Sequence, residues 1–215
     1  AREAVAQVCA AVGDSVPVLM TIFSPLSQAK NLAGPNLLPH LRHHPDAVLA
    51  GLEIITQTIL RYVDALRSTG IAGIFYAAQL AEPSRLSRPE YERFGRPLDL
   101  RILENSRDLW FNMVHLHGPN GYFDLLADYP VQAINWHDRE AGPSLAQAAA
   151  MFPGALSGGL DRWTVHRGTP DQVRNEATDA IAQTGGRRLI LSTGCVAMTN
   201  SPLSTLRAAR GSVVE

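Results

Sequence analysis

Two short segments of the chain carry residue types that could bind a metal. His115 and His117 lie in His115-Leu116-His117-Gly118 at the end of one apolar run, and Cys195 ends another such run, Ser192-Thr193-Gly194-Cys195. Two imidazoles and one thiolate are enough for a catalytic zinc site, which takes three protein ligands and keeps a fourth position open. The elements that carry these segments must therefore bring them together.

The composition is that of a globular chain suited to small-molecule chemistry. Of its 215 residues, 46% are apolar and 18% are charged, with a net charge of -1, which is enough apolar content for one core and one domain. Lysine and arginine are scattered, so no basic stripe indicates nucleic acid or an anionic membrane surface as a partner. We find neither a membrane span nor a secretory signal and expect a cytoplasmic protein. Two cysteines, Cys9 and Cys195, are too few for a disulfide framework, which leaves Cys195 free to act as a ligand.

Apolar runs alternate with amphipathic segments along the chain. The pattern predicts strands at 16–23, 71–76, 109–116, 131–136, 155–159 and 188–193. It predicts helices at 24–33, 45–69, 88–107, 122–127, 144–151, 170–183 and 202–210, and residues 1–12 are typical of a helix that ends an earlier unit. Six consecutive βα units indicate a parallel sheet with helices outside it.

Such a sheet could be open and doubly wound or closed into a barrel. No glycine-rich dinucleotide motif follows a strand, and polar residues gather at the ends of many strands, which favours the barrel. A complete (β/α)8 barrel takes about 250 residues and eight strands. We therefore expect a single α/β domain over residues 1–215, a (β/α)8 TIM barrel truncated at its N-terminus by roughly two βα units.

Barrel enzymes place their chemistry at the C-terminal ends of the strands. Those positions hold Phe23-Ser24, Tyr76, His115 and His117, Trp136-His137-Asp138, Asp161 and Cys195. We take Asp138 and Tyr76 as candidate catalytic residues. Phe23, Trp136 and Asp161 are candidates for contact with a small-molecule substrate. His115 and His117 are two residues apart on a strand and should face the same side, whereas Cys195 must reach them from three strands further round.

Several candidates also have an ordinary structural interpretation. Cys195 could be a small buried residue, and His117 could hydrogen-bond a carbonyl. Trp136 could pack in the core. Asp138 could orient a ligating imidazole, but it lies in a charged run typical of a solvated turn. Asp161 is well placed to cap a helix.

A third group of histidines resembles a metal tract by composition alone. His40, His43 and His44 precede Pro45 at the start of a long predicted helix. This position favours a solvent-exposed loop, with a lid as the alternative.

Several motifs resemble the uroporphyrinogen decarboxylase superfamily. They are Gly158-Gly159-Leu160-Asp161, Gly168-Thr169-Pro170-Asp171-Gln172-Val173 and Leu189-Ile190-Leu191-Ser192-Thr193-Gly194-Cys195, in matching order and spacing, with Thr21-Ile22-Phe23-Ser24-Pro25-Leu26 and Ser87-Arg88-Pro89-Glu90-Tyr91 upstream. The similarity covers nearly all of the chain. The resemblance implies a (β/α)8 barrel, in agreement with the pattern of strands and helices.

The superfamily has two branches, and the sequence departs from the first. True uroporphyrinogen decarboxylases need no cofactor. Where they carry a histidine, this chain has Cys195, and where they carry a tyrosine, it has Lys30 or Asn31. Where they carry an Asp-Ser pair, it has Tyr76-Ala77. The corrinoid-linked methyltransferases carry a zinc site made of a His-x-Cys motif and a final cysteine. On that template His115 and Cys195 match, and His117 replaces the first cysteine.

The resemblance implies a metal-dependent, methyltransferase-like enzyme with zinc at His115, His117 and Cys195, and with a corrinoid on a partner protein as methyl carrier. Replacing cysteine by histidine lowers the negative charge on the metal, which favours a Lewis acid acting on an ether, hydroxylated or carboxylated small molecule. Two alternatives remain: a uroporphyrinogen decarboxylase of porphyrin biosynthesis, and a silent member that binds a small ligand or a corrinoid protein. Exposed sheet edges would also permit a homodimer.

Overall fold

The protein folds around one parallel sheet whose strands follow each other in chain order. The computed structural model describes residues 1–213. Its 6-stranded sheet has the order β1-β2-β3-β4-β5-β6, and every neighbouring pair is parallel. The strands are β1 (Leu19–Phe23), β2 (Gly73–Ala78), β3 (Met113–Leu116), β4 (Ala133–Trp136), β5 (Ala155–Leu160) and β6 (Leu189–Thr193). The six predicted βα units are confirmed.

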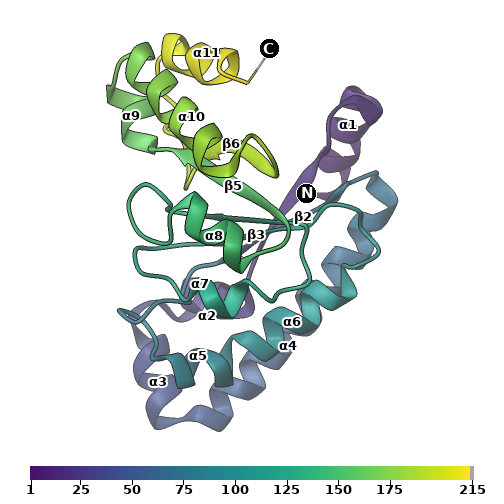
Figure 1. The fold of residues 1–215 in the computed structure, drawn as a ribbon. Helices are drawn as coiled ribbons and strands as arrows, with labels where there is room; N and C mark the ends of the chain where they lie inside the picture. The colour runs from purple at the N-terminus through teal and green to yellow at the C-terminus, as the bar shows by residue number, and fades with distance from the viewer. Residues whose placement is uncertain (214–215) are drawn as a thin grey trace.

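Helices make the crossovers that parallel strands require. An N-terminal helix, α1 (Arg2–Val12), precedes β1 (Figure 1). The others, each between strands or after the last one, are α2 (Pro25–Ala33), α3 (Leu37–His43), α4 (Pro45–Leu66), α5 (Arg88–Phe94), α6 (Arg96–Asn105), α7 (Phe123–Leu126), α8 (Leu145–Met151), α9 (Arg162–Arg167), α10 (Pro170–Thr184) and α11 (Leu203–Gly211). No helix in the described part of the chain has both the length and the apolar character needed to cross a bilayer.

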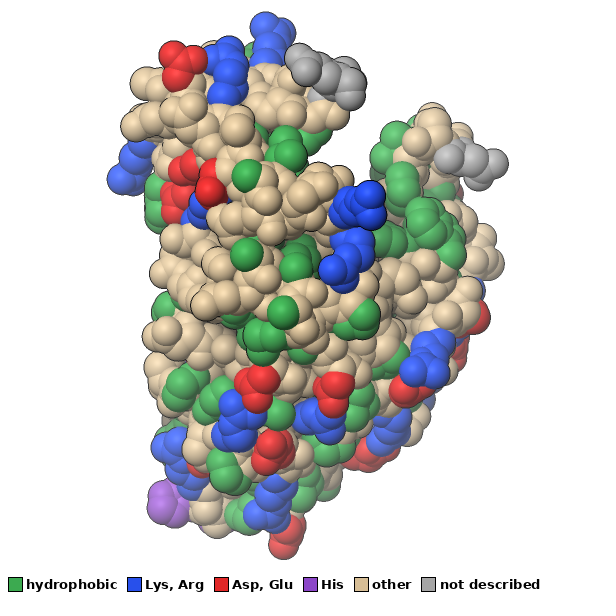
Figure 2. Space-filling model, in the orientation of Figure 1, with side chains coloured by type: hydrophobic (Ala, Val, Ile, Leu, Met, Phe, Trp, Pro, Cys, Tyr) green, Lys and Arg blue, Asp and Glu red, His purple; other side chains and the backbone are tan. Residues whose placement is uncertain are grey.

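The sheet remains open between its first and last strands. Within residues 1–213, β1 pairs only with β2, and β6 pairs only with β5. In Figure 1, α1 lies on one side of this opening and α9 to α11 lie on the other, and Figure 2 shows a notch in the surface between them. The architecture is that of six successive units of a β/α barrel, with the concave face of the sheet accessible from the open side.

Side chains alternate between the two faces of the strands, as strand geometry requires. On β2, Phe75 and Ala77 line a cavity on the inner face, whereas Ile74 and Tyr76 pack into the core between sheet and helices. This alternation decides which strand-end residues can reach a site in the barrel mouth.

The helices differ from the prediction at several places, among them α9, which was not predicted, and two of the differences have identifiable reasons. Residues 37–43 form α3 rather than a loop because Leu37 and Leu41, four positions apart, are both buried on one face. The predicted helix over 88–107 divides into α5 and α6 next to Pro97, whose ring clashes with a continuing helix. The histidines His40 and His43 of α3 are exposed, as expected.

A buried carboxylate ties β2 to the helical layer. Asp99 on α6 accepts hydrogen bonds from the hydroxyl groups of Tyr76 at 2.6 Å, Tyr91 at 2.5 Å and Tyr129 at 3.0 Å. Burial outweighs these bonds and raises the pKa of Asp99 from 3.8 to about 6. The folded protein therefore holds this proton more tightly than the unfolded chain does.

We predict that this carboxyl makes stability fall as pH rises. Between the unfolded pKa of 3.8 and the folded pKa of about 6, the unfolded state binds fewer protons, so the free energy of unfolding should decrease by roughly 3 kcal/mol across that window. Urea unfolding of the wild type and of Asp99→Asn from about pH 4 to about pH 7 measures this pH-dependent decrease in the free energy of unfolding. The decrease should be absent in the variant. Parallel pH profiles for the two proteins would contradict the assignment.

Candidate metal centre

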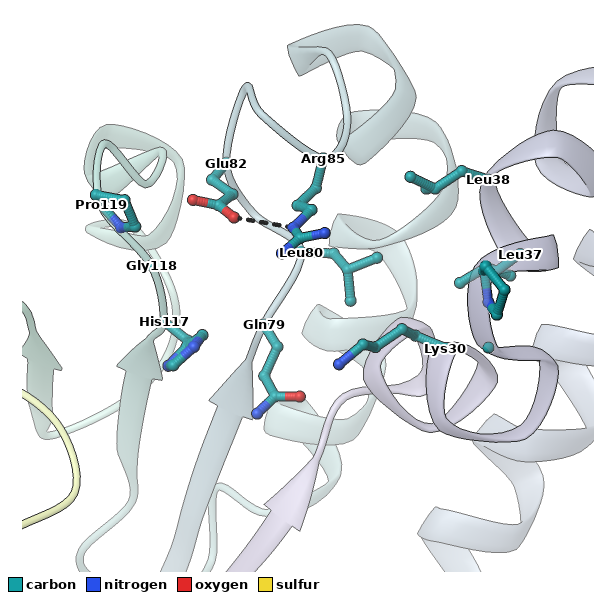
Figure 3. Close-up of a pocket in the computed structure, with 12 residues that line it drawn as sticks. Lys30, Leu37, Leu38, Gln79, Leu80, Glu82, Arg85, His117, Gly118 and Pro119 are labelled. Atoms are coloured by element: carbon teal, nitrogen blue, oxygen red, sulfur yellow. Dashed lines mark ion pairs between the residues drawn. The ribbon is translucent and has the colours of Figure 1, made fainter. Parts of the chain in front are cut away.

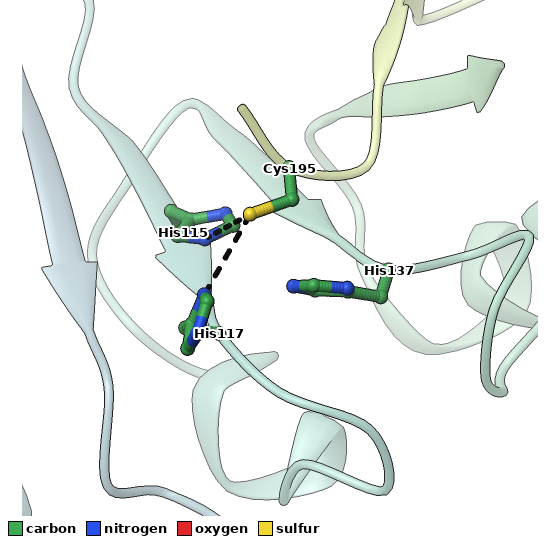
Figure 4. Close-up of side chains that lie close together, drawn as sticks. All are labelled: His115, His117, His137 and Cys195. Atoms are coloured by element: carbon green, nitrogen blue, oxygen red, sulfur yellow. Dashed lines mark hydrogen bonds between the residues drawn. The ribbon is translucent and has the colours of Figure 1, made fainter. Parts of the chain in front are cut away.

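Four side chains from three strands converge at the mouth of the sheet. His115 lies on β3, His117 and His137 directly follow β3 and β4, and Cys195 lies two residues beyond β6. One ligand atom from each of the four lies within 4.8 Å of the others. The Cys195 sulfur is 4.0 Å from Nε2 of His115 and 3.7 Å from Nδ1 of His117. Figure 4 shows the three rings and the sulfur facing a common centre.

Strand register explains how three of the donors meet. Leu116 of β3 pairs with Trp136 of β4, so His117 and His137 leave the sheet at equivalent positions on neighbouring strands. Their ring centroids are 5.2 Å apart. His115 and His117 also lie on the same side of β3, as the sequence predicts.

A glycine brings the fourth donor into range. A Cβ on Gly194 would lie 2.4 Å from the carbonyl oxygen of Trp136, so the chain after β6 passes against the backbone at the end of β4. The hydroxyl of Thr193 donates to the carbonyl of Cys195 and fixes the turn. Cys195 thereby reaches across from β6 to the histidines of β3 and β4.

Asn135 fixes the orientation of one imidazole. Its amide nitrogen donates to the carbonyls of Ser157 at 2.8 Å and Thr193 at 3.1 Å, which leaves its oxygen to accept from Nδ1 of His115 at 2.6 Å. Nδ1 of His115 therefore carries a proton, and Nε2 is the ring nitrogen that faces Cys195, where it can donate to the thiolate or, once deprotonated, bind a metal. Histidines that bind metals commonly donate a hydrogen bond from the other ring nitrogen, which fixes the orientation of the ring.

The electrostatics of the cluster favour a thiolate. Burial opposes ionisation of Cys195, but contacts with the imidazoles of His115, His117 and His137 and the backbone N–H of Val196 together lower its pKa to about 3. Cys195 in turn raises the pKa of His137. Thiolate is the form of cysteine that binds metals. Nε2 of His137 is buried and has no hydrogen-bond partner among the described residues, as expected of a donor atom reserved for a metal.

A cavity of about 390 Å³ adjoins the cluster. Its apolar wall includes Phe23, Phe75 and Val196, and Phe75 stacks on the ring of His115 with centroids 5.5 Å apart. Its polar side chains are Thr21, Gln79, Asn135, Ser157, Ser192 and Thr193. His115, His117 and Cys195 border the cavity and His137 does not, so a molecule in the cavity meets three of the four donors.

The structure brings only part of the predicted site together. Three predicted ligands and Phe23 share the cavity. Tyr76 faces the helical layer with its hydroxyl on Asp99, so the catalytic role expected of it gives way to a structural one. Trp136 is 2% exposed and packs against Phe123 rather than lining the cavity.

The two predicted acids also lie outside the cavity. Asp161 caps α9 by accepting from the backbone N–H groups of Trp163 and Thr164, which gives it a local role rather than a substrate contact. Asp138 accepts from the N–H of Gly159 at 3.0 Å, and burial raises its pKa to about 6. It is next to His137 in the chain, but no hydrogen bond links its carboxylate to an imidazole among the described residues.

His137 is the donor that the sequence analysis placed at a strand end but did not assign to the metal. It stands within the charged run 135–140, which is typical of a turn. Its position one residue after a strand end, like that of His117, was the available signal.

The fold and the four donors define a β/α-barrel protein with a candidate metal centre. The chain belongs to the uroporphyrinogen decarboxylase (URO-D) family, whose model matches residues 1–215. The predicted family and fold are thus confirmed. A search of curated proteins gives no match.

Solved structures share the fold at low sequence identity. A methyltransferase from Methanosarcina mazei superimposes with a TM-score of 0.87 at 20% identity, covering 99% of this chain and 62% of that one. A putative vitamin-B12 independent methionine synthase from Listeria monocytogenes gives a TM-score of 0.64 at 14% identity, covering 99% of this chain and 67% of that one. The chain therefore spans less than two thirds of the length of the Methanosarcina protein.

We predict that Asn135→Ala weakens zinc binding by about ten- to a hundredfold, because His115 loses the acceptor that orients it. Asn135→Asp retains an acceptor for Nδ1 but places an oxygen against the carbonyls of Ser157 and Thr193, so it should recover only part of the affinity. Competition with a chelator of known zinc affinity measures both variants, and circular dichroism checks that they fold. Unchanged affinity in folded Asn135→Ala would refute the role of this hydrogen bond.

Proposed function

We propose that the protein is a metal-dependent, methyltransferase-like enzyme that acts on a small molecule. The observation that carries this proposal is the convergence of three imidazoles and one thiolate beside a cavity. Buried titratable groups gathered at a strand-end cavity are typical of reactive sites. Family membership supports an enzyme of the URO-D superfamily.

The donor set fits zinc. Zinc takes thiolate sulfur and imidazole nitrogen in tetrahedral geometry, and the compact group of His115, His117, His137 and Cys195 supplies four such donors. We assign all four to the metal; because they fill its tetrahedral positions, a substrate from the cavity side would have to add as a fifth ligand or displace one imidazole. When bound, zinc would act as a Lewis acid that lowers the pKa of a coordinated thiol or polarises another heteroatom.

The remaining residues prepare the cavity for the reacting end of a substrate. Asn135 holds the ring of His115. Phe23 and Phe75 present apolar surface, which excludes water from the reacting atoms and strengthens polar interactions there. Ser157 and Ser192 share a hydrogen bond of 2.8 Å on the polar side of the cavity and can turn their hydroxyl groups toward a ligand.

A corrinoid on a partner protein is the methyl carrier in this proposal. It is supported by the resemblance of His115 and Cys195 to the ligand positions of the corrinoid-linked branch. The Methanosarcina protein of similar fold is itself a methyltransferase by name. Decarboxylation of a porphyrinogen is less well supported, because no lysine or arginine among the described residues lines the cavity beside the cluster to offset a polycarboxylate.

Zinc content tests the proposal most simply. We predict one zinc ion per chain in the wild type and none in dialysed Cys195→Ser, since the thiolate is the strongest donor of the set. Cys9→Ser is the matched control, because Cys9 is the other free, buried cysteine and should leave zinc content unchanged. Metal analysis by mass spectrometry measures all three proteins.

Two outcomes would count against this site. Wild-type protein that binds no stoichiometric zinc would favour a silent, ligand-binding member. Equal zinc contents in wild type and Cys195→Ser would place the metal elsewhere.

A further inference from the structure

A second cavity adjoins the one beside the metal cluster. Its volume is about 300 Å³, and its lining includes Lys30, Gln79, Glu82, Arg85 and His117. Gln79 and His117 also line the first cavity, so the two spaces share a wall. Figure 3 shows the polar side chains of the second cavity arranged around its opening beside α2 and α3. A molecule held at the metal cluster can therefore extend into this space.

The second cavity contains a buried acceptor without a donor. The side chain of Glu82 is 6% exposed, and its Oε1 lies 3.4 Å from Nε of Arg85. Its Oε2 is buried and has no hydrogen-bond partner among the described residues. An unsatisfied buried carboxylate oxygen is unfavourable unless a donor reaches it. A ligand in the cavity can supply that donor once the carboxylate turns toward it.

The backbone beside Glu82 leaves room for this carboxylate. Gly118 has a φ of 101°, and a Cβ at this position would lie 2.5 Å from Oε2 of Glu82. Any other residue would be strained and would displace the carboxylate. Gly118, the residue that follows His117, thus leaves room for the Glu82 carboxylate in the wall of the second cavity.

The charges around the cavity select among ligand groups. Lys30 is exposed and extends its ammonium group toward Gln79 (Figure 3), and it forms no ion pair with the described residues. Arg85 is already paired with Glu82, so Lys30 is the unpaired charge: it repels a cationic group, and it attracts an anionic group that Glu82 repels. Hydroxyl groups can donate to Glu82 and accept from Lys30 without either repulsion, because they are both donors and acceptors.

We propose that the second cavity is a subsite for a hydroxylated tail of the substrate, with Glu82 accepting from one hydroxyl group of the tail and Lys30 donating to another. This inference rests on the proposed function, which places the reacting end of the same molecule at the metal cluster. The substrate class is then a small hydroxylated molecule whose uncharged reacting end occupies the cavity of Phe23 and Phe75.

Matched thiols test the subsite. Protein loaded with Co²⁺ is titrated with 1-thioglycerol and with 1-propanethiol, which share a carbon skeleton, and binding is followed by the thiolate-to-cobalt absorption. We expect 1-thioglycerol to bind the wild type about tenfold more tightly, the usual order for a hydrogen bond to a charged group. The two thiols should bind Glu82→Leu about equally, and Lys30→Met should show a reduced preference. Glu104→Gln, at an exposed carboxylate of α6, is the control and should keep the wild-type ratio.

Several results would overturn the subsite. The first is that the wild type binds 1-thioglycerol and 1-propanethiol with equal affinity. The second is that the ratio of these two affinities is the same in Glu82→Leu and Lys30→Met as in the wild type. The third is that 3-mercaptopropionate or 3-mercaptopropylamine binds the wild type more tightly than 1-thioglycerol does. If Glu82→Leu does not fold, the affinity ratio in Lys30→Met tests the subsite instead. Lys30 is on the surface, so its substitution should leave the fold intact.

A separate measurement distinguishes failure of the subsite from failure of the metal-centred function. If neither thiol changes the cobalt spectrum of the wild type, the proposed function is wrong. Metal-free protein is then titrated with 1,2-propanediol and followed by amide chemical shifts. Shifts at Gln79 and Glu82 in the wild type, absent in Lys30→Met, would support the subsite, and no shift at Glu82 would refute it.

Discussion

The parallel register of β3 and β4 is the constraint on which the metal cluster depends. Because Leu116 pairs with Trp136, the residues that follow the two strands emerge side by side, and both are histidines. A slip of one residue would turn every side chain of a strand to its opposite face. The buried helical layer opposes such a slip, since Val114 of β3 and Ile134 of β4 are both fully buried on the outer side of the sheet. The site is thus held by the same packing that holds the fold.

The cluster also links strands that lie far apart in the sheet. Asn135 of β4 contacts His115 of β3 and the backbone of β5 and β6 through three hydrogen bonds, and Cys195 closes the group from beyond β6. Three imidazoles around one thiolate form a donor set that a metal ion would complete, since the four ligand atoms lie within 4.8 Å of one another. In the account proposed above, metal binding and the positions of four strands are therefore coupled.

The sequence predicts the fold class and most of the metal cluster, and its errors have physical causes. His115, His117 and Cys195 could be found because they are metal-binding types at strand ends. Tyr76 was misassigned because β2 was predicted to end at residue 76, whereas it runs to Ala78, and alternation then turns Tyr76 outward. His137 was placed at a strand end but not assigned as a ligand, because it stands inside a charged run. The cavity around Glu82 depends on contact between segments distant in the chain, which no local pattern indicates.

The central claim is that one thiolate and three imidazoles bind a single zinc ion. X-ray absorption at the zinc edge of the metal-loaded protein measures this ligand set directly. The account predicts one sulfur at about 2.3 Å and three nitrogens at about 2.0–2.1 Å, with a second sulfur added when 1-propanethiol binds. A shell of nitrogen and oxygen alone, without sulfur, would contradict it.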